Sequence, residues 1–313
     1  MNVLAYMLSA PLARGPYPDL ASWAERLREC PFRGHVERAL WSGFHADRLG
    51  YAFVGGYRAA LARLFEHAAV TQGLPVGVAP LVPHPEGLTC LAATEGGGAH
   101  PRAIATRLDK RGGALILDGE KTYATLATAS DEMLVVASRG VESDGKNRLR
   151  VVRVRRDAGG VEITPRPVTP FAPEVPHARV RLTGVVVEPE DVLPGDGYAI
   201  YLKPFRTIED VHVLASTLGY LLGAGRAYGF AREPLTELVS LALSVVDAGA
   251  RDASAPLTHV VLAGIFGAAR RTAAALDAEW AKADAAERAR WERDAPLLLV
   301  AEAARQKRTD TAW

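Results

Sequence analysis

The hydrophobic pattern of this 313-residue chain changes its period twice. Before residue 86 and after residue 198, apolar residues recur at the three-to-four-residue spacing of amphipathic helices. Between these limits the apolar residues form short runs, and clusters of Gly, Pro and Asp separate them. Such runs are typical of β-strands; they are Ala114–Leu117, Met133–Ala137, Leu149–Val154 and Ala178–Leu182. The pattern therefore predicts a multi-domain α+β chain in which helical domains flank a β-domain.

The first 86 residues are expected to form an N-terminal helical domain. Asp19 is a candidate N-cap for a helical segment at residues 20–27. A longer apolar-periodic run spans residues 49–65 and contains the pair Gly55-Gly56. Because a glycine costs about 1 kcal/mol relative to alanine inside a helix, this pair predicts close packing or a break. Four prolines then predict an extended connector; they are Pro75, Pro80, Pro83 and Pro85.

Residues 87–197 and 198–313 are expected to form a β-domain and a second helical domain. Several short strands at this spacing are typical of a closed barrel or a sandwich. The C-terminal region regains helical periodicity, and we expect its helices near 207–231, 233–249, 255–283 and 285–309. Four helices with short connections predict an antiparallel bundle.

Charge balance and cysteine content argue against several classes of protein. The chain has 37 basic and 36 acidic side chains, and its net charge of +1 does not indicate the concentrated basic face that nucleic acid requires. Cys30 and Cys90 make neither a disulfide scaffold nor a metal-ligand spacing, so we expect free thiols in a reducing cytoplasm and no metal site. No apolar run reaches the ~18 residues of a membrane span, so no span is expected.

Two short motifs lie close together in the middle region. Thr94-Glu95 leads into a glycine-rich loop, and Asp118-Gly119-Glu120-Lys121 is followed by Tyr123 and Thr125. This segment resembles the middle β-domain of the acyl-CoA dehydrogenase family, whose pattern is roughly T-E-P-x-x-G-S-D, then N-G-x-K-x-[WFY]-[IV]-T. Residues 185–195 also resemble the family's V-P-x-x-x-x-L-G strand. The resemblance implies an N-terminal helical domain, a middle antiparallel β-barrel and a C-terminal four-helix bundle.

The resemblance also implies that the two motifs hold the ring of an FAD cofactor. Ala93 and Thr94 would line the pyrimidine edge of the ring, Tyr123 would pack on its face, and Thr125 would face N5. These residue types suit the roles, because an aromatic plane stacks on a planar ring and side chains two apart on a strand share one face. The alternative is that Tyr123 and Thr125 are ordinary barrel residues.

The glycine-rich loop departs from the family pattern. Residues 96–101 read GGGAHP, where the family has P-x-x-G-S-D. The resemblance places Ala99 and His100 in the loop that binds the cofactor, with His100 at the serine that touches the pyrophosphate and Pro101 at the aspartate. Glycines let a backbone approach a phosphate closely, and a histidine can donate a hydrogen bond to it. The alternative is that His100 is a solvated loop residue.

A catalytic base is expected on the first helix of the C-terminal domain. Most of the family carries a glutamate in a late loop, for which the sequence shows no counterpart, but a minority carries it on this helix in the pattern E-R-x-x-x-A-x-x-x-x-G. Glu209 and Gly219 match that pattern, whereas Asp210 and Leu214 replace the arginine and the small residue. Asp210 is expected to raise the pKa of Glu209 by like-charge repulsion. The alternative is that both acidic residues complement the positive end of a helix.

The function that the resemblance implies is FAD-dependent α,β-dehydrogenation of an acyl-CoA or acyl-carrier thioester in fatty acid metabolism. Glu209 would remove the α-proton, flavin N5 would accept the hydride, and an electron-transfer flavoprotein would re-oxidise a homodimeric enzyme. A flavoenzyme that uses oxygen is a further reading. The main alternative is a flavin-poor homologue that acts as a non-catalytic subunit. One observation supports this alternative: the family's R-x-x-F-G and Q-x-x-G-G elements, which contact the ADP half of a neighbour's FAD, have no match here.

Overall fold

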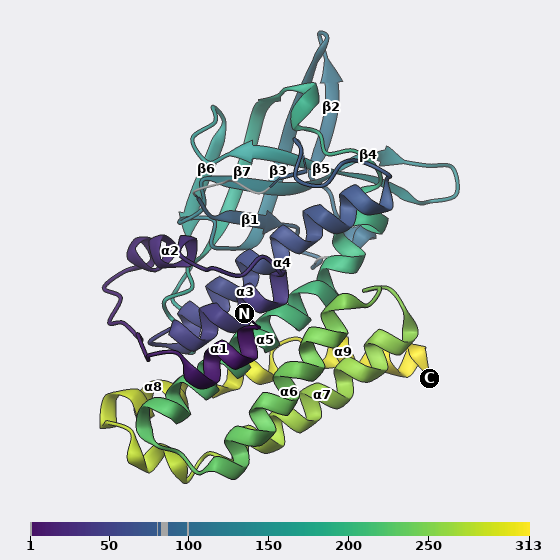
Figure 1. Ribbon diagram of the computed structural model, residues 1–313. Helices are drawn as coiled ribbons and strands as arrows, with labels where there is room; N and C mark the ends of the chain where they lie inside the picture. The colour runs from purple at the N-terminus through teal and green to yellow at the C-terminus, as the bar shows by residue number, and fades with distance from the viewer. Residues whose placement is uncertain (1, 80, 83–86, 99) are drawn as a thin grey trace. The chain divides into compact units, whose positions relative to one another are not determined.

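The computed structural model describes residues 2–79, 81–82, 87–98 and 100–313, which form two compact units. The helical unit comprises Met1–Ala60, Thr169–Glu174 and Phe205–Trp313. The sheet unit comprises Leu61–Val168 and Val175–Pro204 (Figure 1). Helices from both ends of the sequence therefore share one unit. The division into three domains at residues 86 and 197 stays a prediction.

Within the described residues four helices precede the sheet: α1 (Val3–Ser9), α2 (Leu20–Arg28), α3 (His35–His45) and α4 (Leu49–Thr71). The predicted cap of α2 is confirmed, because the Asp19 carboxylate accepts a hydrogen bond from the Ser22 backbone N–H at 2.8 Å. Helix α4 runs unbroken through its glycine pair, so close packing is the correct alternative. A Cβ at Gly56 would lie 2.5 Å from the Ser216 hydroxyl.

The C-terminal region contains three long helices and two short ones. They are α5 (Lys203–Tyr228), α6 (Arg232–Ala250), α7 (Pro256–Ala275), α8 (Ala285–Asp294) and α9 (Glu302–Ala312), and α7 packs against α6 and α9. The single helix expected over residues 285–309 is wrong. Pro296 lacks a backbone N–H and crowds the preceding turn, and Ala301 adopts a φ of 62° before α9 begins. Two short helices joined by Ala295–Ala301 replace it.

The sheet unit contains one seven-stranded sheet, with the order β1-β4-β2-β3-β7-β6 and β5 paired to β4. The strands are β1 (Thr89–Ala92), β2 (Arg107–Arg111), β3 (Ala114–Thr125), β4 (Glu132–Val141), β5 (Asn147–Arg155), β6 (Val161–Pro165) and β7 (His177–Val187). Each predicted β run lies inside one of them. Their inward side chains form an apolar core that includes Cys90, Val135, Val152 and Val180.

The sheet is mixed, so the expected antiparallel barrel is corrected. Strand β4 runs parallel to β1 and, at Arg107–Ser138, to β2, whereas the other pairs are antiparallel. The β2–β3 hairpin lies between β1 and β4 in sequence, and this long crossover brings β4 back in the direction of β1. An antiparallel bridge between Thr94 and Tyr123 joins the residues after β1 to β3.

Two further expectations concern cysteine pairing and membrane insertion. Both cysteines are free thiols; Cys90 is buried and Cys30 is half-buried. Across the described part of the chain, no helix has the length and the hydropathy to cross a bilayer.

Candidate functional site

The sheet unit brings together three of the residues predicted to hold a flavin ring. Ala93 is buried directly after β1, and the next residue, Thr94, pairs with Tyr123 of β3. The Thr122 backbone N–H donates to the Thr94 carbonyl at 2.9 Å. The Thr94 and Tyr123 motifs are therefore neighbours in the fold.

A bulge in the β3–β7 ladder decides how Tyr123 and Thr125 are presented. Lys121 pairs with Val180 and Ala124 with Ala178, so β3 carries one residue more than β7 between these pairs. Bulges of this kind commonly re-aim a side chain. Ala124 is fully buried, whereas Tyr123 is 37% exposed and Thr125 is half-buried. The two side chains thus lie on the outer side of the strand, as the two-residue spacing predicts.

Two side chains that no sequence motif indicates contact the Tyr123 ring. The His177 ring stacks against it with centroids 4.4 Å apart, and the Arg166 guanidinium carbon lies 5.3 Å from its centroid. Arg166 also donates to the Thr122 carbonyl at 2.8 Å. Burial, together with Arg166, lowers the pKa of His177 to about 4, so its imidazole is neutral at pH 7. We call Tyr123, His177 and Arg166 the aromatic platform.

Glu95 of the first motif and Lys121 of the second form a buried ion pair. The fully buried Lys121 ammonium donates to the Glu95 carboxylate and to the Val136 carbonyl, both at 2.6 Å. Glu95 also accepts hydrogen bonds from the Ala105 backbone N–H at 2.7 Å and from the Thr106 hydroxyl at 2.8 Å. Burial lowers the pKa of Lys121 to about 8, and Glu95 opposes this effect. The pair ties the end of β1 to β3 and β4.

The glycine-rich loop begins as a tight turn. Glu95 and Gly98 exchange two backbone hydrogen bonds of 3.1 and 2.8 Å, and Gly98 has a φ of 89°. Ala99 lies outside the described residues. His100 is exposed, and its Nδ1 accepts from the Arg102 backbone N–H at 3.2 Å. Its predicted contact with a phosphate stays a prediction.

Glu209 lies in the helical unit, well inside α5. The helix starts at Lys203 and has no acidic residue in its first turn. A helix dipole acts mainly within the terminal turn. Glu209 therefore does not serve as a partner for the helix N-terminus, and that alternative is wrong.

The Glu209 side chain borders a cavity of about 80 Å³. The cavity lies among α4, α5, α7 and the segment before α9, and its apolar lining includes Phe53, Val213, Leu214, Phe266, Leu297 and Val300. Burial is the main cause that raises the pKa of Glu209 to about 8. The neighbouring Asp210 raises it further, as expected from the sequence, and Arg308 acts in the opposite direction.

Two arginines of α9 hold Asp210. Arg305 Nη1 lies 3.0 Å from Asp210 Oδ1, and Arg308 Nη2 binds Oδ2. Arg305 also donates to the Leu298 carbonyl at 3.3 Å, and its guanidinium carbon lies 4.0 Å from the Phe266 ring centroid. These contacts fasten α9 to α5 next to Glu209. Their sequence separations of 95 and 98 residues left no local pattern from which to predict them.

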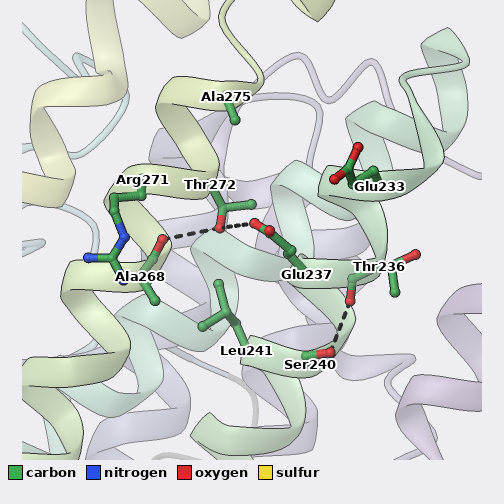
Figure 2. Close-up of a pocket in the computed structure, with 9 residues that line it drawn as sticks. All are labelled: Glu233, Thr236, Glu237, Ser240, Leu241, Ala268, Arg271, Thr272 and Ala275. Carbon is green, nitrogen blue, oxygen red and sulfur yellow. Dashed lines mark hydrogen bonds between the residues drawn. The ribbon is translucent and has the colours of Figure 1, made fainter.

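A larger open pocket lies between α6 and α7, with a volume of about 770 Å³ (Figure 2). The Thr272 hydroxyl donates to Glu237 at 2.9 Å, and the Ser240 hydroxyl donates to the Thr236 carbonyl at 3.1 Å. Among its lining residues two carboxylates, Glu233 and Glu237, stand against one guanidinium, that of Arg271. The excess of negative charge disfavours a phosphate-bearing ligand.

Comparison with known proteins gives one family and many similar folds. Residues 90–185 match the family model described as acyl-CoA dehydrogenase, middle domain. A comparison with curated protein sequences gives no significant match.

Three of the similar solved structures span almost the whole chain. Butyryl-CoA dehydrogenase from Megasphaera elsdenii is 17% identical with a TM-score of 0.71, covering 94% of this chain and 90% of that one. Glutaryl-CoA dehydrogenase from Mycobacterium smegmatis in complex with FADH2 is 15% identical with a TM-score of 0.62, covering 99% and 92%. A chain from a structure of the electron transferring flavoprotein of Acidaminococcus fermentans is 14% identical with a TM-score of 0.65, covering 99% and 86%. At these identities the likeness concerns the fold.

Proposed function

The chain is a member of the acyl-CoA dehydrogenase family, and on this premise we propose that it catalyses FAD-dependent α,β-dehydrogenation of an acyl thioester. Glu209 is the base in this proposal. The observation that carries it is a carboxyl group on α5 that borders an apolar cavity and has a pKa raised to about 8. Removal of the weakly acidic α-proton of a thioester requires a base of this kind, placed where water does not compete for the proton.

The position of Glu209 fits the minority pattern in which the base lies on the first C-terminal helix. The segment before α9 also lines the cavity, and it contributes no carboxylate. Glu302 follows it, but its side chain pairs with Arg270 at 2.9 Å and is 49% exposed. Asp210, the other carboxylate in the lining, is bound by Arg305 and Arg308, so Glu209 is the candidate base at this cavity.

The aromatic platform suits a flavin. Tyr123 offers a partly exposed ring, and the neutral His177 ring stacks with it. Arg166 supplies a positive charge that would favour the electron-rich, reduced ring. When bound, the flavin would accept the β-hydride of the substrate. The residues of this chain would hold the ring, keep water from the α-carbon and take the proton on a carboxylate oxygen of Glu209.

The partners follow from the same proposal. The substrate is an acyl-CoA or an acyl-carrier thioester, and we propose an electron-transfer flavoprotein as the oxidant of the reduced cofactor. A homodimer stays a prediction.

The test is anaerobic reduction of the FAD-loaded protein by a panel of acyl-CoA thioesters, followed by flavin absorbance. We expect Glu209→Gln to slow reduction by about 10²–10⁴-fold without changing flavin content, which is the range for general bases. Glu302→Gln is the matched control, because it alters an exposed glutamate of the same unit, and its rate should equal that of wild type. Reduction of Glu209→Gln at the wild-type rate would exclude Glu209 as the base.

The alternative, a non-catalytic subunit without flavin, is supported by the missing elements for the ADP half of FAD. One spectrum separates the two functions. Purified protein that shows no flavin bands, even after addition of FAD, would favour the non-catalytic subunit.

A further inference from the structure

The lining of the cavity beside Glu209 is mostly apolar. Its surface comes mainly from aliphatic and aromatic side chains of four segments, among them Phe53 of α4, Val213 of α5 and Phe266 of α7. Leu297 and Leu298, both buried, close the side formed by the segment before α9. A group that enters this space gains free energy by burying apolar surface.

The other polar side chains in the lining already have partners. Asp210 and Arg305 bind each other at 3.0 Å, and Arg305 also donates to the Leu298 carbonyl. The Thr217 hydroxyl donates to the Val213 carbonyl at 2.9 Å. A polar substituent placed away from the Glu209 carboxyl would therefore lose its water without an unpaired side chain to replace it, and a carboxylate would have to compete with Asp210 for Arg305.

The volume sets a limit on what fits. An engineered apolar cavity of ~150 Å³ holds benzene, which has six carbon atoms. A cavity of about 80 Å³ is close to half of that and accommodates about three carbon atoms. The carbonyl and α-carbons must stay next to the Glu209 carboxylate, outside the cavity, for the α-proton to be removed.

From these observations we infer that the substrate carries a short, unsubstituted acyl chain of about four to six carbons, whose end occupies this cavity. The inference rests on the proposed function, since Glu209 defines where the α-carbon lies. Phe53, Val213 and Phe266 would determine the length limit.

The test measures binding, so that it does not depend on turnover. Calorimetry measures the binding of acyl-CoA thioesters to FAD-loaded Glu209→Gln protein; the ligands are butyryl-, hexanoyl-, octanoyl-, dodecanoyl- and glutaryl-CoA, with acetyl-CoA as the reference. A second series of acyl-pantetheine thioesters represents carrier-type substrates. We expect affinity to rise about fourfold per methylene up to four to six carbons, and then to level off or fall. Glutaryl-CoA should bind at least about tenfold more weakly than butyryl-CoA, because its carboxylate would be desolvated.

Two variants change the size of the cavity in opposite directions. Phe53→Ala, at a half-buried position, should extend the limit to octanoyl thioesters, and Val213→Phe should reduce butyryl affinity to that of acetyl. Leu243→Ala, at a residue of α6 that is 58% exposed, is the control and should change neither. Circular dichroism checks the fold, and Val213→Phe serves if Phe53→Ala does not fold.

Four results would overturn the inference. They are affinity that keeps rising to dodecanoyl-CoA, glutaryl binding as tight as butyryl, butyryl binding no better than acetyl in both thioester series, and a length limit that neither variant shifts. Failure of the proposed function is a different result: wild-type flavin that no acyl thioester reduces, whatever the binding series shows.

Discussion

Replacement of Lys121 by methionine tests whether the buried ion pair holds the sheet unit together. The ammonium group is fully buried and has two partners at 2.6 Å, the Glu95 carboxylate and the Val136 carbonyl. Methionine fills much of the same space but donates no hydrogen bond. Glu95 would then remain as a buried anion without a counter-charge, and the Val136 carbonyl would lose its donor.

The loss of stability expected for Lys121→Met depends on the hydrogen bonds that Glu95 retains. Breaking a buried pair by removing one partner typically costs about 3–5 kcal/mol. Glu95 would still accept from Ala105 N at 2.7 Å, Thr106 N at 3.1 Å and Thr106 Oγ1 at 2.8 Å, which together stabilise its charge. We therefore expect the lower end of that range, about 3 kcal/mol. Adding Glu95→Gln removes the isolated charge, so the double variant should be more stable than Lys121→Met alone.

Urea unfolding followed by circular dichroism measures these differences as shifts in the midpoint at a common slope. Lys282→Met is the matched control, because Lys282 pairs with Glu279 at 2.7 Å but is 48% exposed, and an exposed pair contributes under about 1 kcal/mol. A loss below about 1 kcal/mol for Lys121→Met, or a double variant less stable than the single one, would refute the reasoning.

Three further predictions concern the acidity of Glu209, the pH dependence of the reaction and flavin binding. The folded-state pKa of Glu209, about 8, lies above its unfolded value of about 4.5, so its contribution to stability is present below pH 4.5 and is lost as pH rises through 8. Urea midpoints measured from pH 4 to 9 should therefore fall more in wild type than in Glu209→Gln. An equal fall in both proteins would contradict the raised pKa of Glu209. The rate of flavin reduction should rise with pH toward 8, and Asp210→Asn should move this profile to lower pH because the repelling charge is gone, whereas an unmoved profile would count against Asp210. Tyr123→Ala should weaken FAD binding by about 5–100-fold, whereas Tyr123→Phe should bind FAD as wild type does, since stacking requires the ring and not the hydroxyl. Fluorescence titration measures both affinities, and unchanged affinity in Tyr123→Ala would show that the ring does not contact the flavin.

Local pattern was sufficient to predict much of the fold. The strands that contain Met133–Ala137 and Leu149–Val154 follow from short apolar runs, and the cap at Asp19 follows from residue type alone. Pro296 lies inside the helix expected over 285–309, and a proline at that position is itself enough to predict a break in the helix. Strand direction was different, because the parallel pairing of β1 with β4 is set by a crossover and not by either strand's own sequence.

The side chains that surround the candidate site could not be predicted from local sequence patterns. Glu209 was selected through the family resemblance, because Glu209 and Gly219 match the minority pattern on one helix. A Cβ at Gly219 would lie only 2.2 Å from the Leu40 carbonyl. In contrast, His177 reaches Tyr123 from a different strand. Arg305 reaches Asp210 from α9, a helix 95 residues further along the chain. Contacts of this kind depend on tertiary packing, which a single sequence does not encode in any local spacing.

Residues 297–308 combine two roles in one short stretch of chain. Leu297 and Leu298 form part of the cavity wall, and Arg305 and Arg308 bind the carboxylate beside Glu209. An insertion or deletion there would move the wall and the two guanidinium groups together. If the proposed function holds, the limit on acyl-chain length and the acidity of Glu209 therefore depend on the same stretch of chain, and exchanging that stretch for the corresponding one of an acyl-CoA dehydrogenase should change both properties together.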